Sequence, residues 1–165
     1  PRSKIYAFEP SKQLSDVIAT NLQYFKNITI VNKAVSNQKN KKIKFYIDDK
    51  NFDGSSLYKE YSSTNNFDLN NYEITDNIKG CDFCFQNNIN KIDILKIDAE
   101  GAELDILMSL NNYLQDISVI YCESHNSANY IQINKMLQNS HKIYRNIKKN
   151  NQLYETIHIN NFFVK

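Results

Sequence analysis

The apolar run at 92–97, which stops at Asp98, constrains the fold of this 165-residue chain more than any other feature. With the carboxylates that follow it, the segment at 95–107 reads LKIDAEGAELDIL. A short and nearly continuous apolar run is typical of a strand that is covered on both faces of a parallel sheet. Helical spacing resumes at about residue 100, so the segment predicts a strand, a tight loop and a helix that packs on the sheet.

The rest of the chain repeats this alternation. We expect further strands at 4–8, 28–35, 41–48, 72–78, 116–124, 142–149 and 153–165, and further helices at 11–25, 82–89 and 128–138. Ser11 is expected to cap the first of these helices. In the helix after residue 100, the spacing of Leu104, Leu107 and Met108 predicts the buried stripe. The two last strands follow one another without a helix, so the predicted class is α/β, with a mostly parallel sheet and an antiparallel C-terminal end.

Composition narrows the function classes. The length suits a single domain over 1–165. The formal net charge is +2 and only two of the 20 basic residues are Arg, which argues against a nucleic-acid partner. No apolar run reaches the roughly 18 residues that cross a membrane, and three cysteines, an odd number, favour a reducing compartment. We therefore expect a cytoplasmic protein, and a homo-oligomer is compatible with the sequence.

Polar side chains follow three of the expected strands at their carboxyl ends. They are Glu9, Asp98, and the pair Glu123 and His125. Ligands of open α/β sheets bind outside these ends, so the side chains are expected to share one rim. Carboxylates there can accept hydrogen bonds from ribose hydroxyls, act as general bases or hold a metal ion.

Each of these residues also has a purely structural interpretation. Acidic residues from Asp98 to Glu103 could simply favour the dipole of a helix start, by ~0.3–1 kcal/mol each. We accept this interpretation for Glu103. Asp98 is retained as a functional candidate, because Gly101 allows a close backbone approach just beyond it. Glu9 could be a solvated strand end, and His125 alone would more often be a surface histidine.

The motif CDFC, from Cys81 to Cys84, has the spacing of a metal or redox site, but a single pair of this kind is a weak signal. Cys84 and Cys122 are instead expected to be small buried hydrophobic residues. The polar segment at 49–72 is expected to be an irregular loop over a site.

Six blocks in the order found here resemble the FkbM-type methyltransferases. Over residues 4–125 they are IYAFEP, NKAVSN, GSSL, ITDNIKGCDFC, IDILKIDAEGAELDIL and VIYCESH. The resemblance implies a Rossmann-like class I methyltransferase sheet. It also implies transfer of a methyl group from S-adenosylmethionine, usually to a hydroxyl on a sugar or polyketide-like product.

The resemblance also implies roles for single positions. On the cofactor side, Glu9 and Pro10 match the acidic block that binds the ribose, Ala34 and Val35 match a loop near the adenine, and Asp98 lies close to the methyl donor. The residues implied on the acceptor side are Asp98, Glu123 and His125 for catalysis and Ser55, Ser56 and Glu100 for substrate binding. His125 or Asp98 is the expected base, with Glu123 orienting. No metal site is predicted, although Asp98 and Glu123 could hold a divalent cation in a variant mechanism.

One departure from the family pattern is large. The family's first strand and its glycine-rich loop, D-x-G-A-N-x-G, are missing, and the chain has only Gly54, Gly80 and Gly101. That strand is central in the family's sheet, so its two neighbours, at 4–8 and 91–98 here, are expected to leave open edges. Pro1 in place of Met favours an N-terminally truncated chain. The alternative to the enzyme is a non-catalytic domain of the same fold that serves as a binding or assembly module.

Overall fold

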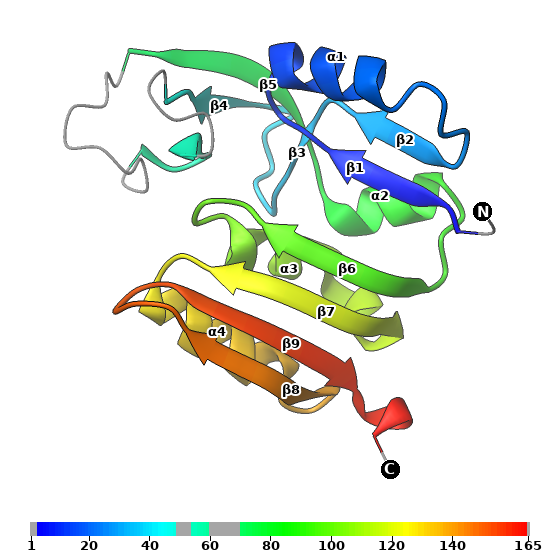
Figure 1. The fold of residues 1–165 in the computed structure, drawn as a ribbon, viewed down its shortest axis with the longest axis vertical. Coiled ribbons are helices and arrows are strands. Elements are labelled where there is room, and N and C mark those ends of the chain that lie inside the picture. The colour runs from blue at the N-terminus through cyan, green and yellow to red at the C-terminus, as the bar shows by residue number, and fades with distance from the viewer. Residues whose placement is uncertain (1–2, 49–53, 60–69, 165) are drawn as a thin grey trace.

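The computed structural model describes residues 3–48, 54–59 and 70–164 as a mixed α/β protein whose strands form three sheets (Figure 1). The strands of the first two sheets, in the orders β1-β2 and β3-β5-β4, are β1 (Ile5–Phe8), β2 (Ile28–Val31), β3 (Ala34–Val35), β4 (Lys42–Tyr46) and β5 (Tyr72–Ile78). The strands of the third sheet, in the order β6-β7-β9-β8, are β6 (Ile92–Asp98), β7 (Ile117–Ser124), β8 (His141–Lys148) and β9 (Tyr154–Asn160).

Parallel and antiparallel pairs are equally represented in the described residues. The pairs β1–β2, β3–β5 and β6–β7 are parallel, and β4–β5, β7–β9 and β8–β9 are antiparallel. The α/β class and the antiparallel C-terminal end are therefore confirmed. The single, mostly parallel sheet of the prediction is not what the structure has, because the strands divide into three mixed or short sheets.

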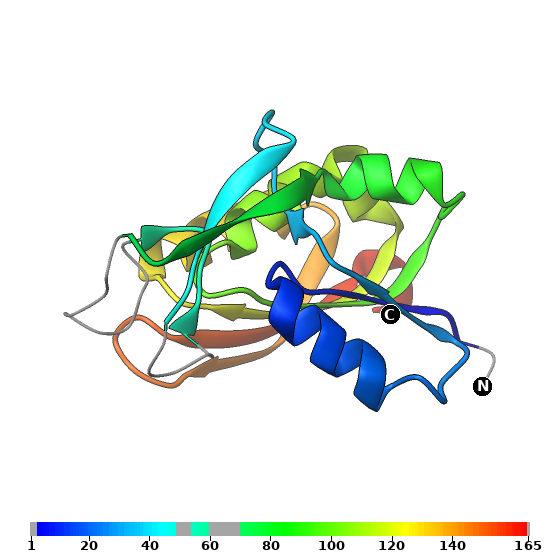
Figure 2. The ribbon, with the colours of Figure 1, turned by 90° about the horizontal axis from the view of Figure 1, so that it is seen from above.

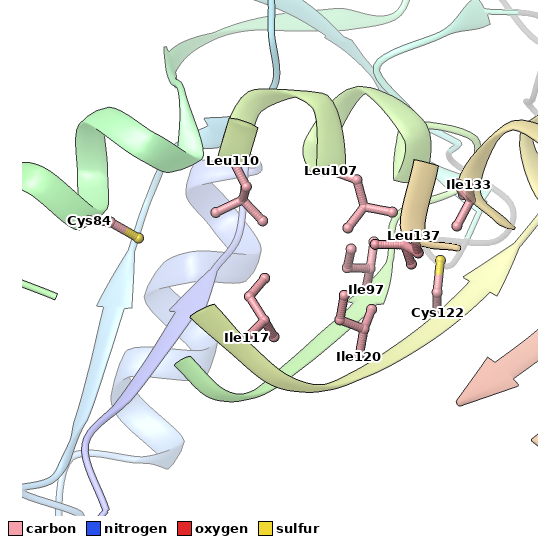
Figure 3. Close-up of a cluster of buried hydrophobic side chains, with 9 residues drawn as sticks. All are labelled: Cys84, Ile97, Leu107, Leu110, Ile117, Ile120, Cys122, Ile133 and Leu137. Atoms are coloured by element: carbon pink, nitrogen blue, oxygen red, sulfur yellow. The ribbon is translucent and has the colours of Figure 1, made fainter. Parts of the chain in front are cut away.

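The helices are α1 (Lys12–Asn21), α2 (Gly80–Gln86), α3 (Glu103–Leu110) and α4 (Ser127–Leu137), with the 3-10 helices η3 (Asn111–Asp116) and η4 (Asn161–Phe163). Helices α3 and α4 lie against one face of the third sheet (Figure 1). The main core forms between this face and the helices (Figure 3). Its buried members are Cys84, Ile97, Leu107, Leu110, Ile117, Ile120, Cys122, Ile133 and Leu137.

Helix α2 joins the first sheet to this core. The ring of Phe83 packs edge-on against Tyr6 and Phe8 of β1, with centroids 5.0 and 4.8 Å away. One residue further along the helix, Cys84 is buried in the core of the third sheet, as predicted, and so is Cys122. Helix α1 covers the opposite side of β1 and β2 (Figure 2). The two sheets are therefore held together by side chains of α2.

Strands β1 and β6 are the facing strands of these two sheets (Figure 1). In the described residues β1 pairs only with β2 and β6 only with β7, so each has one open edge, as expected. The prediction that the strand at 91–98 is covered on both faces is wrong, since Ile94 is 70% exposed whereas Ile97 is 3% exposed. Helices cover only one face of β6.

Several predicted element bounds change in the structure. Helix α1 begins after its Ser11 cap as predicted, but it ends at Asn21, and Phe25 lies in the exposed turn that follows. The strand predicted at 28–35 is broken between β2 and β3, because the side-chain amide of Asn32 donates to the carbonyls of Glu9 and Pro10. Met108 was predicted to be buried but is 45% exposed. Leu110 is buried in the core instead.

Part of the segment predicted as a loop at 49–72 lies outside the described residues, namely 49–53 and 60–69. Its described piece, 54–59, is tied to β4 by an isolated antiparallel bridge between Tyr46 and Ser56. No helix in the described ranges is long and apolar enough to cross a membrane.

The buried imidazole of His158 predicts acid sensitivity. Its ring is 1% exposed, and burial, with a contribution from nearby His141, lowers the pKa of His158 to about 4. The neutral ring is favoured in the folded state, whereas the unfolded chain titrates near 6.5, so stability is full above about pH 6.5 and is lost as the pH falls towards 4. The contribution of His158, measured in urea as the difference in unfolding free energy between the unaltered protein and His158→Gln, should fall by about 2 kcal/mol between about pH 7.5 and pH 5. A difference that does not change with pH would contradict the assignment.

Candidate active site

Three carboxylates lie in one row across the third sheet. Asp98 at the end of β6 is the register partner of Glu123 on β7, and Glu123 is in turn the partner of Glu155 on β9. Directly opposed residues share a face of a sheet, so the three side chains point to the same side. The apolar runs of β6 and β7 end at this row, which places the carboxylates at the carboxyl edge of the parallel pair, where ligands bind.

Two lysines balance the row from its solvent side. The ammonium of Lys96 lies 2.8 Å from Asp98 Oδ2, and that of Lys149 lies 3.5 Å from Glu123 Oε1 and 2.6 Å from Glu155 Oε1. The Tyr121 hydroxyl donates to Glu155, and this bond, with burial, raises the pKa of Tyr121 to about 12. The side chains of Lys96 and Lys149 are 61% and 41% exposed, so both ion pairs are screened by water and can exchange with a ligand.

His125 is held more firmly. Its Nδ1 lies 2.8 Å from Glu103 Oε1, a carboxylate with no exposed surface, and its Nε2 lies 3.2 Å from Glu100 Oε1. Burial alone would lower the pKa of His125, but hydrogen bonds and charge from the two carboxylates raise it to about 10. The imidazole is therefore protonated at neutral pH, with both ring N–H groups in use.

The loop between β6 and α3 adopts an unusual backbone conformation. Glu100 has φ 43° and Gly101 has φ 95°, in the left-handed region that is costly for a residue with a side chain. Hydrogen bonds from three segments hold it. Ser56 Oγ donates to the Glu100 carbonyl (2.6 Å), Asn129 Nδ2 donates to the Gly101 carbonyl (3.1 Å), and Gly101 N donates to Glu103 Oε1 (2.8 Å).

Of the two predicted substrate-binding serines, one lies beside this loop. Ser56 is 1% exposed and its hydroxyl is engaged with Glu100 and Tyr58, so it supports the loop from inside the protein. Ser55 accepts a hydrogen bond from Asp48 N instead. Glu100 itself is partly exposed, with 27% of its side chain accessible next to His125.

Glu9 lies apart from the carboxylate row, after β1. Its Oε1 accepts a hydrogen bond from Ser11 N (2.8 Å). Burial raises the pKa of Glu9, the Ser11 bond lowers it and the charge of Glu73 raises it again, with a net increase. The carbonyl of Pro10 accepts from Asn32 and Thr75. In the described residues no hydrogen bond or ion pair joins Glu9 to Asp98 or Glu123.

Ala34 and Val35 do not lie in a loop, and the prediction that they do is wrong. They form β3, which pairs with the last two residues of β5. Ala34 is fully buried, and Val35 is partly buried. Of this pair, therefore, only Val35 presents surface to a ligand.

Comparison with known protein families identifies the family of this chain. The sequence profile of the methyltransferase FkbM domain matches residues 1–162. The chain belongs to the FkbM methyltransferase domain family. No curated protein and no solved structure matches it. The resemblance found in the six sequence blocks is thereby confirmed, and membership of the family suggests methyltransferase activity.

Within this FkbM domain, the structure brings together three of the predicted site residues. Asp98, Glu123 and His125 each offer a ligand atom within 4.8 Å of the other two, a spacing that could hold a metal ion. Sequence reasoning missed Glu103, which we had interpreted as a helix-start residue, and Glu155. The alternation in LYETIHIN was a signal for a half-buried strand, but it did not fix the register that sets Glu155 beside Glu123.

The buried ion pair of Glu103 and His125 predicts a large effect on the stability of this FkbM domain. His125→Gln removes the cation beside a fully buried carboxylate, so we expect a loss of about 3–5 kcal/mol in the free energy of unfolding. Glu100→Gln is the matched control, because it removes only the more exposed partner of the same ring and should cost about 1 kcal/mol. Urea unfolding at neutral pH measures both. Equal losses in the two variants would contradict the greater contribution of the Glu103–His125 pair.

Proposed function

We propose that this chain is an S-adenosylmethionine-dependent methyltransferase domain that methylates a hydroxyl on a sugar or another small-molecule or glycan acceptor. The observation that carries the proposal is the Asp98–Glu123 pair, with His125, at the carboxyl ends of two parallel strands in an FkbM-family chain. Such a rim is where α/β folds bind ligands, and the residue types suit the handling of one proton.

The residues after β1 fit the ribose half of the cofactor. Glu9 uses Oε1 to cap the turn at Ser11, which fixes the carboxylate and leaves Oε2 for a ribose hydroxyl. Its partial burial strengthens a hydrogen bond to such a donor. The methionine half is different, because the three glycines of the sequence are widely separated and form no glycine-rich loop. The fit therefore rests on Glu9.

When bound, S-adenosylmethionine supplies an electrophilic methyl group. The chain's own task is to align an acceptor hydroxyl with it and to take up the proton that the hydroxyl loses. Asp98 is the proposed base, because 37% of its side chain is exposed and Lys96, the cation that pairs with it, is itself 61% exposed. Glu123 is more buried and next to Asp98, which suits it to orient the acceptor.

We propose a different role for His125 from the general-base role that the sequence suggested. A protonated ring with both N–H groups donating has no lone pair to accept a proton. It is instead placed to hold Glu100 and the loop after β6 at the acceptor side. The proposal therefore keeps Asp98 as the base and gives His125 a positioning role.

A second candidate is a non-catalytic binding or assembly module with the same fold. The observation in its favour is the pair of open edges on β1 and β6, together with the lack of a glycine-rich loop in the sequence. Binding of S-adenosylhomocysteine, the demethylated cofactor, separates the two candidates, because a module that has lost the cofactor site would not bind it.

We expect S-adenosylhomocysteine to bind this chain in a calorimetric titration, with affinity that depends on Glu9. Glu9→Gln removes the charged acceptor for the ribose, which should weaken binding by about 10- to 100-fold, or roughly 1.5–3 kcal/mol. Glu73→Gln is the matched control. Glu73 lies close enough to raise the pKa of Glu9, but its own carboxylate accepts a hydrogen bond from Lys12 N. It should leave the affinity within about twofold.

Either of two results would count against the proposal. Absence of binding both to this chain and to a chain extended upstream of Pro1 would favour the non-catalytic module. Equal affinities of the Glu9 and Glu73 variants would remove the ribose assignment.

A further inference from the structure

The site contains more negative than positive groups. Five carboxylates belong to it: Asp98, Glu100, Glu103, Glu123 and Glu155. Their basic partners are Lys96, Lys149 and His125, and Arg145 also acts on Glu155. The five carboxylates therefore outnumber the four basic side chains at the ends of β6 and β7 and the start of β9. Like charges this close repel one another unless another cation joins them.

Glu103, which contacts His125 of the cluster, has a buried carboxylate oxygen that is left unsatisfied. Its side chain has no exposed surface, and its Oε1 serves both His125 Nδ1 and Gly101 N. Its second oxygen, Oε2, is buried without a hydrogen-bond partner in the part of the chain that the structure describes. A buried carboxylate oxygen left unsatisfied beside a histidine costs free energy, and it raises the local demand for positive charge.

The orientation of His125 also matches that of a metal-binding histidine. Histidine ligands commonly donate one ring N–H to a buried carboxylate, which fixes the ring and leaves the other nitrogen for the metal. Here Glu103 holds Nδ1, so a cation would have to take Nε2, which pairs with Glu100 in this structure. The contact of Nε2 with Glu100 is longer, at 3.2 Å, and Glu100 is partly exposed and can move aside or join as a ligand.

We propose that Asp98, Glu123 and His125 form a binding site for one divalent cation of the Mg²⁺ or Mn²⁺ class, which holds the hydroxyl of the acceptor. Two carboxylates and one imidazole suit these hard or borderline ions, and the cluster has no thiolate to favour a softer one. Only the role in holding the acceptor rests on the proposed function. The cation site itself stands on the cluster.

Cation binding changes the protonation of the site in a defined way. The Nε2 proton of His125 leaves to solvent as Nε2 takes the metal, and Lys96 and Lys149 release Asp98 and Glu123. The net charge of the site then rises by one unit if both lysines stay within the site, because the added charge of +2 replaces one proton. The cation would make a bound acceptor hydroxyl more acidic, and the proton would still pass to Asp98, whose carboxylate can bind the cation through one oxygen and accept the proton on the other.

The test measures binding of Mn²⁺ alone to tag-free protein of the full 165 residues, by the loss of the electron paramagnetic resonance signal of the free ion. We expect one Mn²⁺ per chain for the unaltered protein. Asp98→Asn and Glu123→Gln should each weaken binding by about tenfold or more, and Glu103→Gln, which affects the orientation of His125, by about 10- to 100-fold.

The matched control is Asp93→Asn. Asp93 is also on β6 and is paired with a lysine, Lys91, but its side chain is 86% exposed and lies outside the cluster. It should bind Mn²⁺ as the unaltered protein does. Circular dichroism verifies that each variant is folded, and the two ligand variants at partly exposed positions decide the result if Glu103→Gln does not fold.

The proposal is overturned if the unaltered protein binds no Mn²⁺, or if the Asp98 and Glu123 variants bind it as well as the Asp93 variant does. Because neither cofactor nor acceptor is present, this failure would leave the methyltransferase proposal intact. Failure of that proposal appears separately, as lack of S-adenosylhomocysteine binding.

Discussion

Glu103 is a carboxylate with no exposed surface, and burying such a charge costs several kcal/mol unless it is paired and hydrogen-bonded. The arrangement of the site follows from how that cost is offset. Oε1 accepts from Gly101 N, which draws the loop after β6 back over the start of α3, and it pairs with His125, which fixes the chain just after β7. One buried oxygen thus joins the ends of two parallel strands.

Other segments depend on the loop that this contact creates. The Glu100 backbone lies in the left-handed region, and the carbonyls of Glu100 and Gly101 are held there by Ser56 from the 54–59 segment and by Asn129 from α4. Strain of this kind persists where the surroundings over-determine it, and it is common at functional sites. The GSSL block therefore contributes to the site through support of the loop, even though its buried serine has no surface to offer a ligand.

The sequence was sufficient to predict the strands whose neighbours are local. The strand and helix order around β6, α3 and β7 follows from apolar periodicity, and the proximity of Asp98 and Glu123 follows from the rule that parallel strands share a carboxyl edge. Glu155 was not predictable, because its position depends on the register of β9 against β7. The exposure of Ile94 depends on what covers the outer face of β6, which the apolar pattern of a single strand does not specify. Glu103 was missed for a different reason: an acidic residue in the first turn of a helix is ordinarily explained by the dipole alone.

The charges of the site change in character from its interior to its surface. Glu103 is fully buried, Glu123 and His125 have 16% of their side chains exposed, and Asp98 has 37%. The inner pair is locked by burial, whereas the outer carboxylates are balanced by lysines, whose flexible ammonium groups are held weakly in water. A ligand can therefore displace the outer cations without disturbing the inner pair. This division lets one site combine a fixed scaffold, built from Glu103 and His125, with carboxylates at Asp98 and Glu123 that are free to bind.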